Sequence, residues 1–182
     1  GNIMKISISW LQEKNACPEG IEWFREKYPE HLDGVGYQSI LDDLSKENKH
    51  VWADWLMLKA GSTNEVLEIK GNLTLEHSLF FAGSIKVSKN ISVGGDVTSG
   101  RGVTAGGDVK VGGGVTAGGD VTAGRDVKVG GGVTAGGDVT AGRYYGIYVG
   151  LLVRGSQKSE NTIVYSKTKP KNLILGEWQE TK

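Results

Sequence analysis

The chain has 182 residues with 21 basic and 21 acidic side chains, so its formal net charge is zero and the simplest electrostatic argument for nucleic-acid binding is absent. Glycine is abundant at 29 residues, but the glycines are phased with valines and therefore do not indicate disorder. A single cysteine excludes an internal disulfide framework, and the sequence lacks both a bilayer-spanning apolar run and a signal-peptide pattern, so we expect a cytoplasmic protein without a membrane anchor.

Residues 1–61 predict a small helical head that contains four of the five tryptophans. Residues 1–3, ahead of Met4, are interpreted as a cloning remnant. Met4 to Trp10 alternates in polarity and predicts a short strand or a docking arm. Three helices are then expected: one that starts at Pro18 and buries Ile21, Phe24 and Tyr28, a second over 37–46 and a third over 51–59.

Residues 62–153 carry a six-residue repeat. One apolar position recurs every six residues from Leu67 to Leu151, and a second apolar or small position follows two residues later, from Ile69 to Val153. Each unit thus reads in-out-in followed by a glycine-rich turn, which is typical of a very short strand and a sharp corner. Three units make one coil of 18 residues, and residues 108–125 recur unchanged as 126–143.

The fold class that follows is mainly β: a three-sided parallel β-helix, or solenoid, of roughly five coils. Stacked coils pair each strand with those above and below. Val109 and Val127, with Val111 and Val129, are expected to build a branched aliphatic wall on one side, whereas Val-Thr-Ala units fill the other two sides. Identical coils do interchangeable work, so no unique catalytic centre is expected among them.

Residues 154–182 predict a β-rich basic C-terminal cap. Tyr144 and Tyr145 are expected to close the stack, and a terminal hairpin is expected to cover the last coil, because an uncapped β-helix exposes unpaired backbone groups. The basic character of the cap comes from Lys158, Lys167, Lys169 and Lys171. Contact with a phosphate backbone or an acidic protein is one interpretation of these lysines, and solvated loop residues are the other.

Two family resemblances accompany these patterns. The head motifs resemble a small helical segment at the start of many uncharacterised phage and prophage proteins; they are Trp10-Leu11, Cys17-Pro18-Glu19-Gly20, Trp23-Phe24 and Trp52-Ala53-Asp54-Trp55-Leu56. The Gly-x-Val-x-Ala hexads resemble the repeat of bactofilins, which implies a polymer-forming cytoskeletal β-helix. Similar hexads occur in hexapeptide acyltransferases.

The sequence gives little indication of a catalytic site or of a metal-binding site. A hexapeptide acyltransferase needs a histidine base on the coils, and His77 is the one eligible residue; we interpret it as a surface or corner histidine. Cys17 is interpreted as a small buried apolar residue beside Pro18. Asp108 and Asp126 stack one coil apart, and we expect such corner aspartates to accept hydrogen bonds from turn amides and not to bind calcium. No catalytic residue, metal or cofactor is assigned.

The function expected is non-enzymatic macromolecule binding. If the phage resemblance holds, the protein is an accessory factor that inhibits or sequesters a host target, for example an anti-CRISPR or other anti-defence inhibitor. A bactofilin-like scaffold and an acyltransferase are the alternatives. We expect a protein partner. The basic cap makes nucleic acid a second candidate partner, and a homodimer or homotrimer is a candidate assembly. The candidate partner-binding residues are Trp23, Trp52, Trp55, Lys110, Lys128, Lys167, Lys169 and Lys171.

Overall fold

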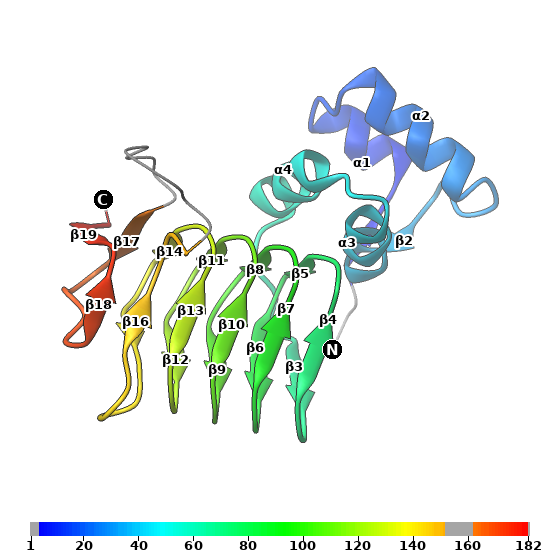
Figure 1. Ribbon diagram of the computed structural model, residues 1–182. Coiled ribbons are helices and arrows are strands. Elements are labelled where there is room, and N and C mark those ends of the chain that lie inside the picture. The colour runs from blue at the N-terminus through cyan, green and yellow to red at the C-terminus, as the bar shows by residue number, and fades with distance from the viewer. Residues whose placement is uncertain (1–3, 152–161, 182) are drawn as a thin grey trace. The chain divides into compact units, whose positions relative to one another are not determined.

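The computed structural model describes residues 4–151 and 162–181. The chain folds into two compact units, Gly1–Ala60 and Gly61–Lys182, which we call the head and the solenoid (Figure 1). In its described residues the head consists of helices α1 (Ile8–Glu13), α2 (Pro18–Lys27), α3 (Tyr37–Lys46) and α4 (His50–Ala60), with a two-stranded antiparallel ribbon of β1 (Lys5–Ile6) and β2 (Val35–Gly36).

The helices of the head agree with most of the sequence predictions. The start at Pro18 and the helix over 37–46 are confirmed, and the helix predicted over 51–59 extends one residue further at each end. The strand predicted over 4–10 is limited to Lys5–Ile6, because the Ser7 side chain accepts a hydrogen bond from the Trp10 backbone N–H at 3.0 Å and starts helix α1. Trp10 therefore lies on a helix.

Each helix of the head contributes apolar residues to one small core. Buried apolar residues of the head include Ile6, Leu11, Phe24, Tyr37, Ile40, Leu41, Leu44, Ala53 and Leu56. Burial raises the pKa of Tyr37 to about 12. The pKa of Tyr28 is also raised, first by burial and then by the hydrogen bond that its hydroxyl donates to Asp43 Oδ2 at 2.6 Å. Both phenols therefore favour the neutral form in the folded head.

The solenoid is built from three parallel sheets, which we number in chain order. Sheet 1 consists of β3 (Val66–Ile69), β6 (Ser84–Val87), β9 (Val103–Ala105), β12 (Val121–Ala123) and β15 (Val139–Thr140). Sheet 2 consists of β4 (Leu73–Leu75), β7 (Ile91–Val93), β10 (Val109–Val111), β13 (Val127–Val129), β16 (Ile147–Tyr148) and β18 (Leu173–Leu175). Sheet 3 consists of β5 (Leu79–Phe81), β8 (Val97–Ser99), β11 (Val115–Ala117), β14 (Val133–Ala135), β17 (Ile163–Ser166) and β19 (Glu177–Glu180).

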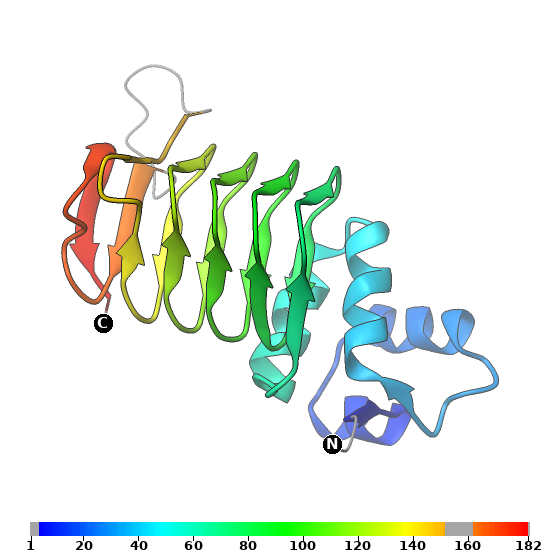
Figure 2. The same ribbon diagram turned by 90° about the horizontal axis from the view of Figure 1, so that it is seen from below.

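The parallel β-helix with 18-residue coils is confirmed. Val109 pairs with Val127, and Lys110 pairs with Lys128, so each strand lies directly on its counterpart in the next coil (Figure 2). In strands such as β10 and β13 the first and third residues point inward and join one continuous apolar core, whereas the middle residues point out. Sheet 2 carries valines at both inward positions of β10 and β13, which confirms the aliphatic wall.

The C-terminal part of the solenoid corrects the sequence prediction in two ways. Sheets 2 and 3 each contain six strands, so the solenoid has about six coils and not five. The predicted phase of the hexads fails after β15: Val127 pairs with Ile147 and not with Tyr145, because residues 142–146 form a longer turn. One misplaced turn shifts every later pairing, since register is set by the length of the connection.

The predicted terminal hairpin is wrong as well. Strand β18 pairs with β16 and β19 pairs with β17, both in parallel, so these segments extend the solenoid. In the described residues sheet 1 has no strand in the sixth coil, where buried Pro170 has no N–H to donate. Some predictions fall outside the described residues. These are the boundary at 153/154, the residues Leu152, Val153 and Lys158, and residues 1–3.

Candidate functional site

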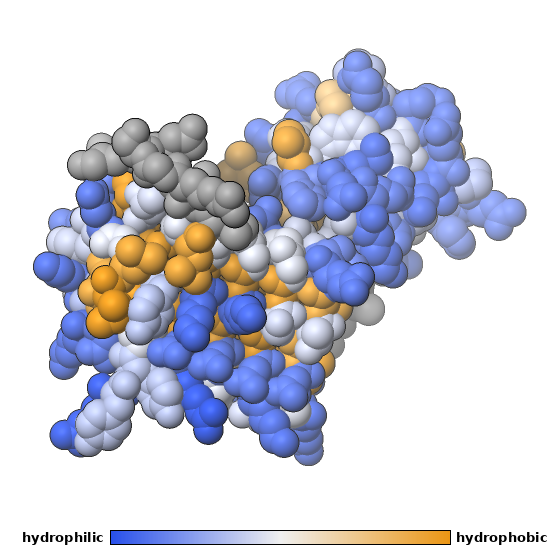
Figure 3. Space-filling view, viewed as in Figure 1, coloured by the Kyte–Doolittle hydropathy of each residue, from blue (hydrophilic) through white to orange (hydrophobic). Residues whose placement is uncertain are grey.

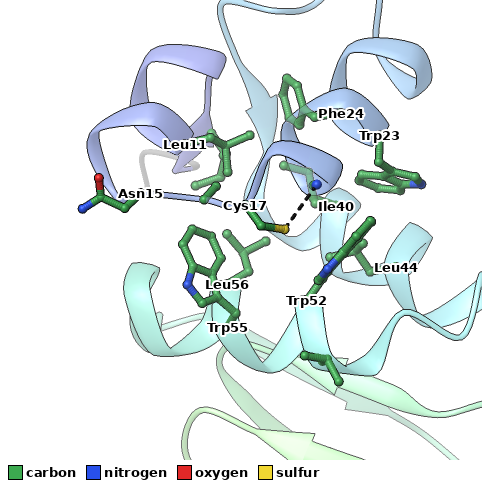
Figure 4. Close-up of a pocket in the computed structure, with 14 residues that line it drawn as sticks. Leu11, Asn15, Cys17, Trp23, Phe24, Ile40, Leu44, Trp52, Trp55 and Leu56 are labelled. Carbon is green, nitrogen blue, oxygen red and sulfur yellow. Dashed lines mark hydrogen bonds between the residues drawn. The ribbon is translucent and has the colours of Figure 1, made fainter.

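The head contains a cavity of about 310 Å³ on which three of the predicted binding residues converge (Figure 4). Trp23 and Phe24 from α2 face Trp52 and Trp55 from α4, which supplies one side of the cavity. The complete lining is Ile6, Leu11, Asn15, Ala16, Cys17, Gly20, Trp23, Phe24, Ile40, Leu44, Val51, Trp52, Trp55 and Leu56. We call it the aromatic pocket.

Helical spacing explains why α4 lines the aromatic pocket. Residues one turn apart share a face of a helix, so Val51 and Trp55 lie above one another, and Trp52 and Leu56 form a second row beside them. Leu56 is buried in the core, the two tryptophans are half-buried, and Val51 is 79% exposed at the rim. The exposure of the pocket-lining residues of α4 therefore increases from Leu56 in the core to Val51 at the rim.

Specific contacts hold the tryptophan rings in place. Trp23 and Trp52 meet edge to face with their centroids 6.2 Å apart, and Trp55 meets Trp10 in the same way at 6.4 Å. The Trp23 indole N–H donates to Glu47 Oε1 at 3.1 Å. Lys49 Nζ lies 4.5 Å from the centre of the Trp52 ring. Rings restrained in this way present a preformed apolar surface, which reduces the entropy lost when a partner binds.

The charge beside the tryptophans is tied to the same contacts. The hydrogen bond from Trp23 lowers the pKa of the Glu47 carboxyl, and a second contribution comes from Lys27, whose Nζ lies 3.2 Å from Glu47 Oε2. Glu47 is therefore ionised near neutral pH and keeps the Trp23 indole oriented.

The position of Cys17 corrects the prediction that it is buried. Cys17 is an exposed free thiol that caps α2, where its Sγ accepts a hydrogen bond from the Gly20 backbone N–H at 3.4 Å (Figure 4). It occupies the cap position because Pro18 starts the helix and leaves Cys17 extended. Apart from the indole N–H groups of the tryptophans, Cys17 and Asn15 are the side chains that bring polar or sulfur atoms to an otherwise apolar lining. Neither residue was predicted to line a binding site, since the binding residues predicted in the head are all tryptophans.

The predicted lysines belong to the solenoid and not to the pocket lining. Lys110 and Lys128 lie in register on the outer surface of sheet 2, and Lys128 Nζ is 3.7 Å from Asp126 Oδ2. Lys167, Lys169 and Lys171 are exposed on the segment between β17 and β18.

The aspartates expected at the corners accept backbone hydrogen bonds, as predicted. Asp108 Oδ1 accepts from the Asp126 N–H at 3.0 Å, and Asp120 Oδ1 accepts from the Asp138 N–H at 2.7 Å. Within residues 4–151 and 162–181, no cluster of three or more His, Cys, Asp or Glu side chains could hold a metal ion. His77 is exposed at a corner, with its Nδ1 2.8 Å from the Ser78 carbonyl oxygen.

Two protein-family models match the chain. The Flagellar Assembly Protein A beta solenoid domain matches residues 65–175, and the YdhT N-terminal domain matches residues 4–64. The two matches correspond closely to the solenoid and the head, and neither description names a phage protein or a bactofilin. No curated protein and no solved structure matches the chain. Among the described residues, none of the helices has the length and apolar character needed to cross a membrane.

Proposed function

This chain belongs to the family of Flagellar Assembly Protein A β-solenoid domains, and we propose that it is a non-enzymatic binding protein whose head captures a partner protein through the aromatic pocket. The observation that carries the proposal is the pocket itself: about 310 Å³ of space walled by Trp23, Trp52 and Trp55 in a unit of only 60 residues. A head of this size would gain stability by filling that space, so leaving it open favours a role in recognition.

The chemistry of the lining selects an apolar anchor. Apart from Asn15 and Cys17 the lining is made of carbon-rich side chains, so a charged group entering the pocket would lose hydration without compensation. An aliphatic or aromatic side chain would instead contribute roughly 1.5 to 3 kcal/mol on burial. We therefore expect the partner to insert one or two apolar side chains between the tryptophans, which are a residue type enriched at binding hot spots.

The proposal keeps two classes of partner. The family description names a flagellar assembly protein, so a component of such an assembly is one class. A host defence component, as expected for a phage accessory inhibitor, is the other. In both cases we place the interaction in the cytoplasm, where the exposed Cys17 thiol stays reduced.

Two surface substitutions on α4 test the pocket without disturbing the core. Val51 lines the pocket and is 79% exposed, whereas Leu58 lies outside the lining and is 78% exposed. Val51→Gln places a polar group at the rim, and Leu58→Gln makes a comparable change in exposed apolar area on the same helix. The tagged full chain and both variants are used for capture from bacterial lysate, followed by mass spectrometry and by titration of the purified partner.

The expected result is a stoichiometric partner whose affinity falls about tenfold or more with Val51→Gln and is unchanged with Leu58→Gln. The first change replaces the apolar rim that would cover the partner's apolar side chain, whereas the second lies outside the pocket. Identification of that partner decides between the assembly and defence classes. Recovery of the chain alone as long oligomers would overturn the proposal in favour of a scaffold. Equal binding by both variants would show that the aromatic pocket is not the contact.

A further inference from the structure

A second surface, independent of the aromatic pocket, runs along the corner between sheet 1 and sheet 2. Successive coils place their turn residues on top of one another here, as shown by backbone bonds from Lys89 N–H to the Gly71 carbonyl, from Gly107 to Lys89 and from Arg125 to Gly107. These turns form the row at the lower edge of the solenoid in Figure 1. Lys89 and Arg125 therefore project from one line, two coils or about 10 Å apart.

Further cations extend this line onto sheet 2 and toward the last coil. Lys110 and Lys128 are the middle residues of β10 and β13, next to the corner, and their strands are about 4.8 Å apart. Arg143 lies in the long turn before β16, and Asn172 ties the following segment to this turn through a hydrogen bond to the Gly142 carbonyl. We define the basic edge as the exposed residues Lys89, Lys110, Arg125, Lys128, Arg143 and Lys171.

The acidic residues on the basic edge are fewer and already engaged. Asp108 and Asp126 each use Oδ1 to accept a backbone N–H from the next coil. Lys128 contacts Asp126, but no carboxylate in the described part of the chain lies within ion-pair distance of Lys110. The face of sheet 2 in Figure 3 shows hydrophilic side chains gathered along this lower edge.

Like charges stacked in register are unfavourable, and the fold does not require them. Sheet 3 places Thr116 on Thr134 at the equivalent middle positions, in the same in-out-in pattern. Lys110 and Lys128 therefore repel each other where threonines at the same positions would not, which favours a functional reason for them.

Tyrosines accompany the cations. Tyr148 pairs with Lys128 in register on the outside of sheet 2, and Tyr144 and Tyr145 project from the turn that contains Arg143. Tyr144 is 85% exposed, with the Arg143 guanidinium 5.3 Å from its ring centre. A row of cations beside exposed aromatic rings is the arrangement that binds single-stranded nucleic acid, because the cations follow the phosphates and the rings stack on the bases.

We infer that the basic edge binds single-stranded nucleic acid, an activity that goes beyond the protein-binding role proposed for the head. A strand lying along the coils would meet cations at intervals of about 5 to 10 Å, comparable with the spacing of its phosphates. Its bases would reach the exposed tyrosine rings at the end of the row. Duplexes, whose bases are already stacked, would gain less from these rings.

The test uses the full chain and labelled oligonucleotides of about 20 residues, compared with their blunt duplex and with polyphosphate, by fluorescence anisotropy between about 50 and 200 mM salt. The main variant is Lys110→Thr/Lys128→Thr, which copies the residues of the other sheets and should fold normally. Lys46→Gln/Lys59→Gln removes the same charge from the head as a control. Tyr144→Ala tests stacking at a position too exposed to affect folding.

We expect the lysine pair to weaken single-strand binding about tenfold at low salt and to reduce the slope of log Kd against log salt by roughly 1 to 1.5, with the head control within about twofold. Tyr144→Ala should weaken binding about fivefold or more without changing the slope, and should leave polyphosphate binding unchanged. No binding at low salt would overturn the inference, as would equal loss in the head control. Equal affinity for polyphosphate or duplex would overturn the single-strand assignment. A further pair, Lys167→Thr/Lys169→Thr, tests the lysines between β17 and β18, and loss of single-strand binding in this pair alone would overturn the assignment to the basic edge.

Discussion

Replacing Gly124 with alanine should separate two coils of the solenoid, because a methyl group at this position would lie 2.0 Å from the carbonyl oxygen of Gly106. That oxygen belongs to the backbone of the neighbouring coil and cannot rotate away. Restoring an ordinary contact requires a shift of more than about 1 Å. Such a shift breaks the hydrogen bond from the Gly124 N–H to the Ala105 carbonyl, which is 2.9 Å long.

The magnitude follows from the contacts that this shift disrupts. One lost backbone hydrogen bond costs about 1 kcal/mol, and the disturbed packing of the adjacent valines adds about 1 to 3 kcal/mol. Reduced flexibility of the unfolded chain offsets less than about 1 kcal/mol. We therefore expect Gly124→Ala to lower the free energy of unfolding by about 2 to 3 kcal/mol. Gly102→Ala is the matched control, since the nearest atom to its added methyl group is 3.4 Å away.

The assay is urea unfolding of the full chain, followed by far-UV circular dichroism for the β-sheets. Tryptophan fluorescence serves as an internal reference because four of the five tryptophans lie in the head. The circular dichroism midpoint should fall for Gly124→Ala and stay near the wild-type value for Gly102→Ala. If Gly124→Ala unfolds within about 0.5 kcal/mol of wild type, or if both variants lose the same stability, the argument from close approach is refuted.

Three further predictions concern side chains. Asp108→Ala should cost about 1 to 2 kcal/mol in urea unfolding by leaving the Asp126 N–H without its acceptor, whereas Asp108→Asn should be nearly neutral, because Asn90 makes the same bond one coil earlier. Because the pKa of Tyr28 is raised in the folded head, its contribution to stability is fully present below pH 10.0, the ordinary tyrosine value, and is lost as pH rises above that value. The free energy of unfolding, measured by tryptophan fluorescence, should therefore decline less steeply above pH 10.0 in Tyr28→Phe than in the wild type. Lys128→Thr should change the unfolding free energy by no more than about 0.5 kcal/mol, because relief from Lys110 balances loss of the exposed contact with Asp126; a larger loss in calorimetry would contradict this balance.

Local sequence signals predicted the elements of both units well. The helix over 37–46 and the short strands of three or four residues from β4 to β14 follow from patterns that repeat within a few residues. The stacking of Val109 on Val127 also follows from sequence, because identical coils of equal length can only repeat the same register. The aromatic pocket was anticipated only as a set of tryptophans, without the space between them or the contribution of Cys17.

The sequence by itself determined the three-sided solenoid and its inward and outward positions, since period-two alternation and glycine corners act over short distances. Tertiary structure alone decided which distant residues meet. Asn15, Trp23 and Trp55 line one pocket because α2, α4 and the turn after α1 converge, and Ile147 replaces Tyr145 above Val127 because a turn is longer than the repeat. Such contacts depend on how helices pack and on how long connections run, and neither quantity is encoded in a local pattern.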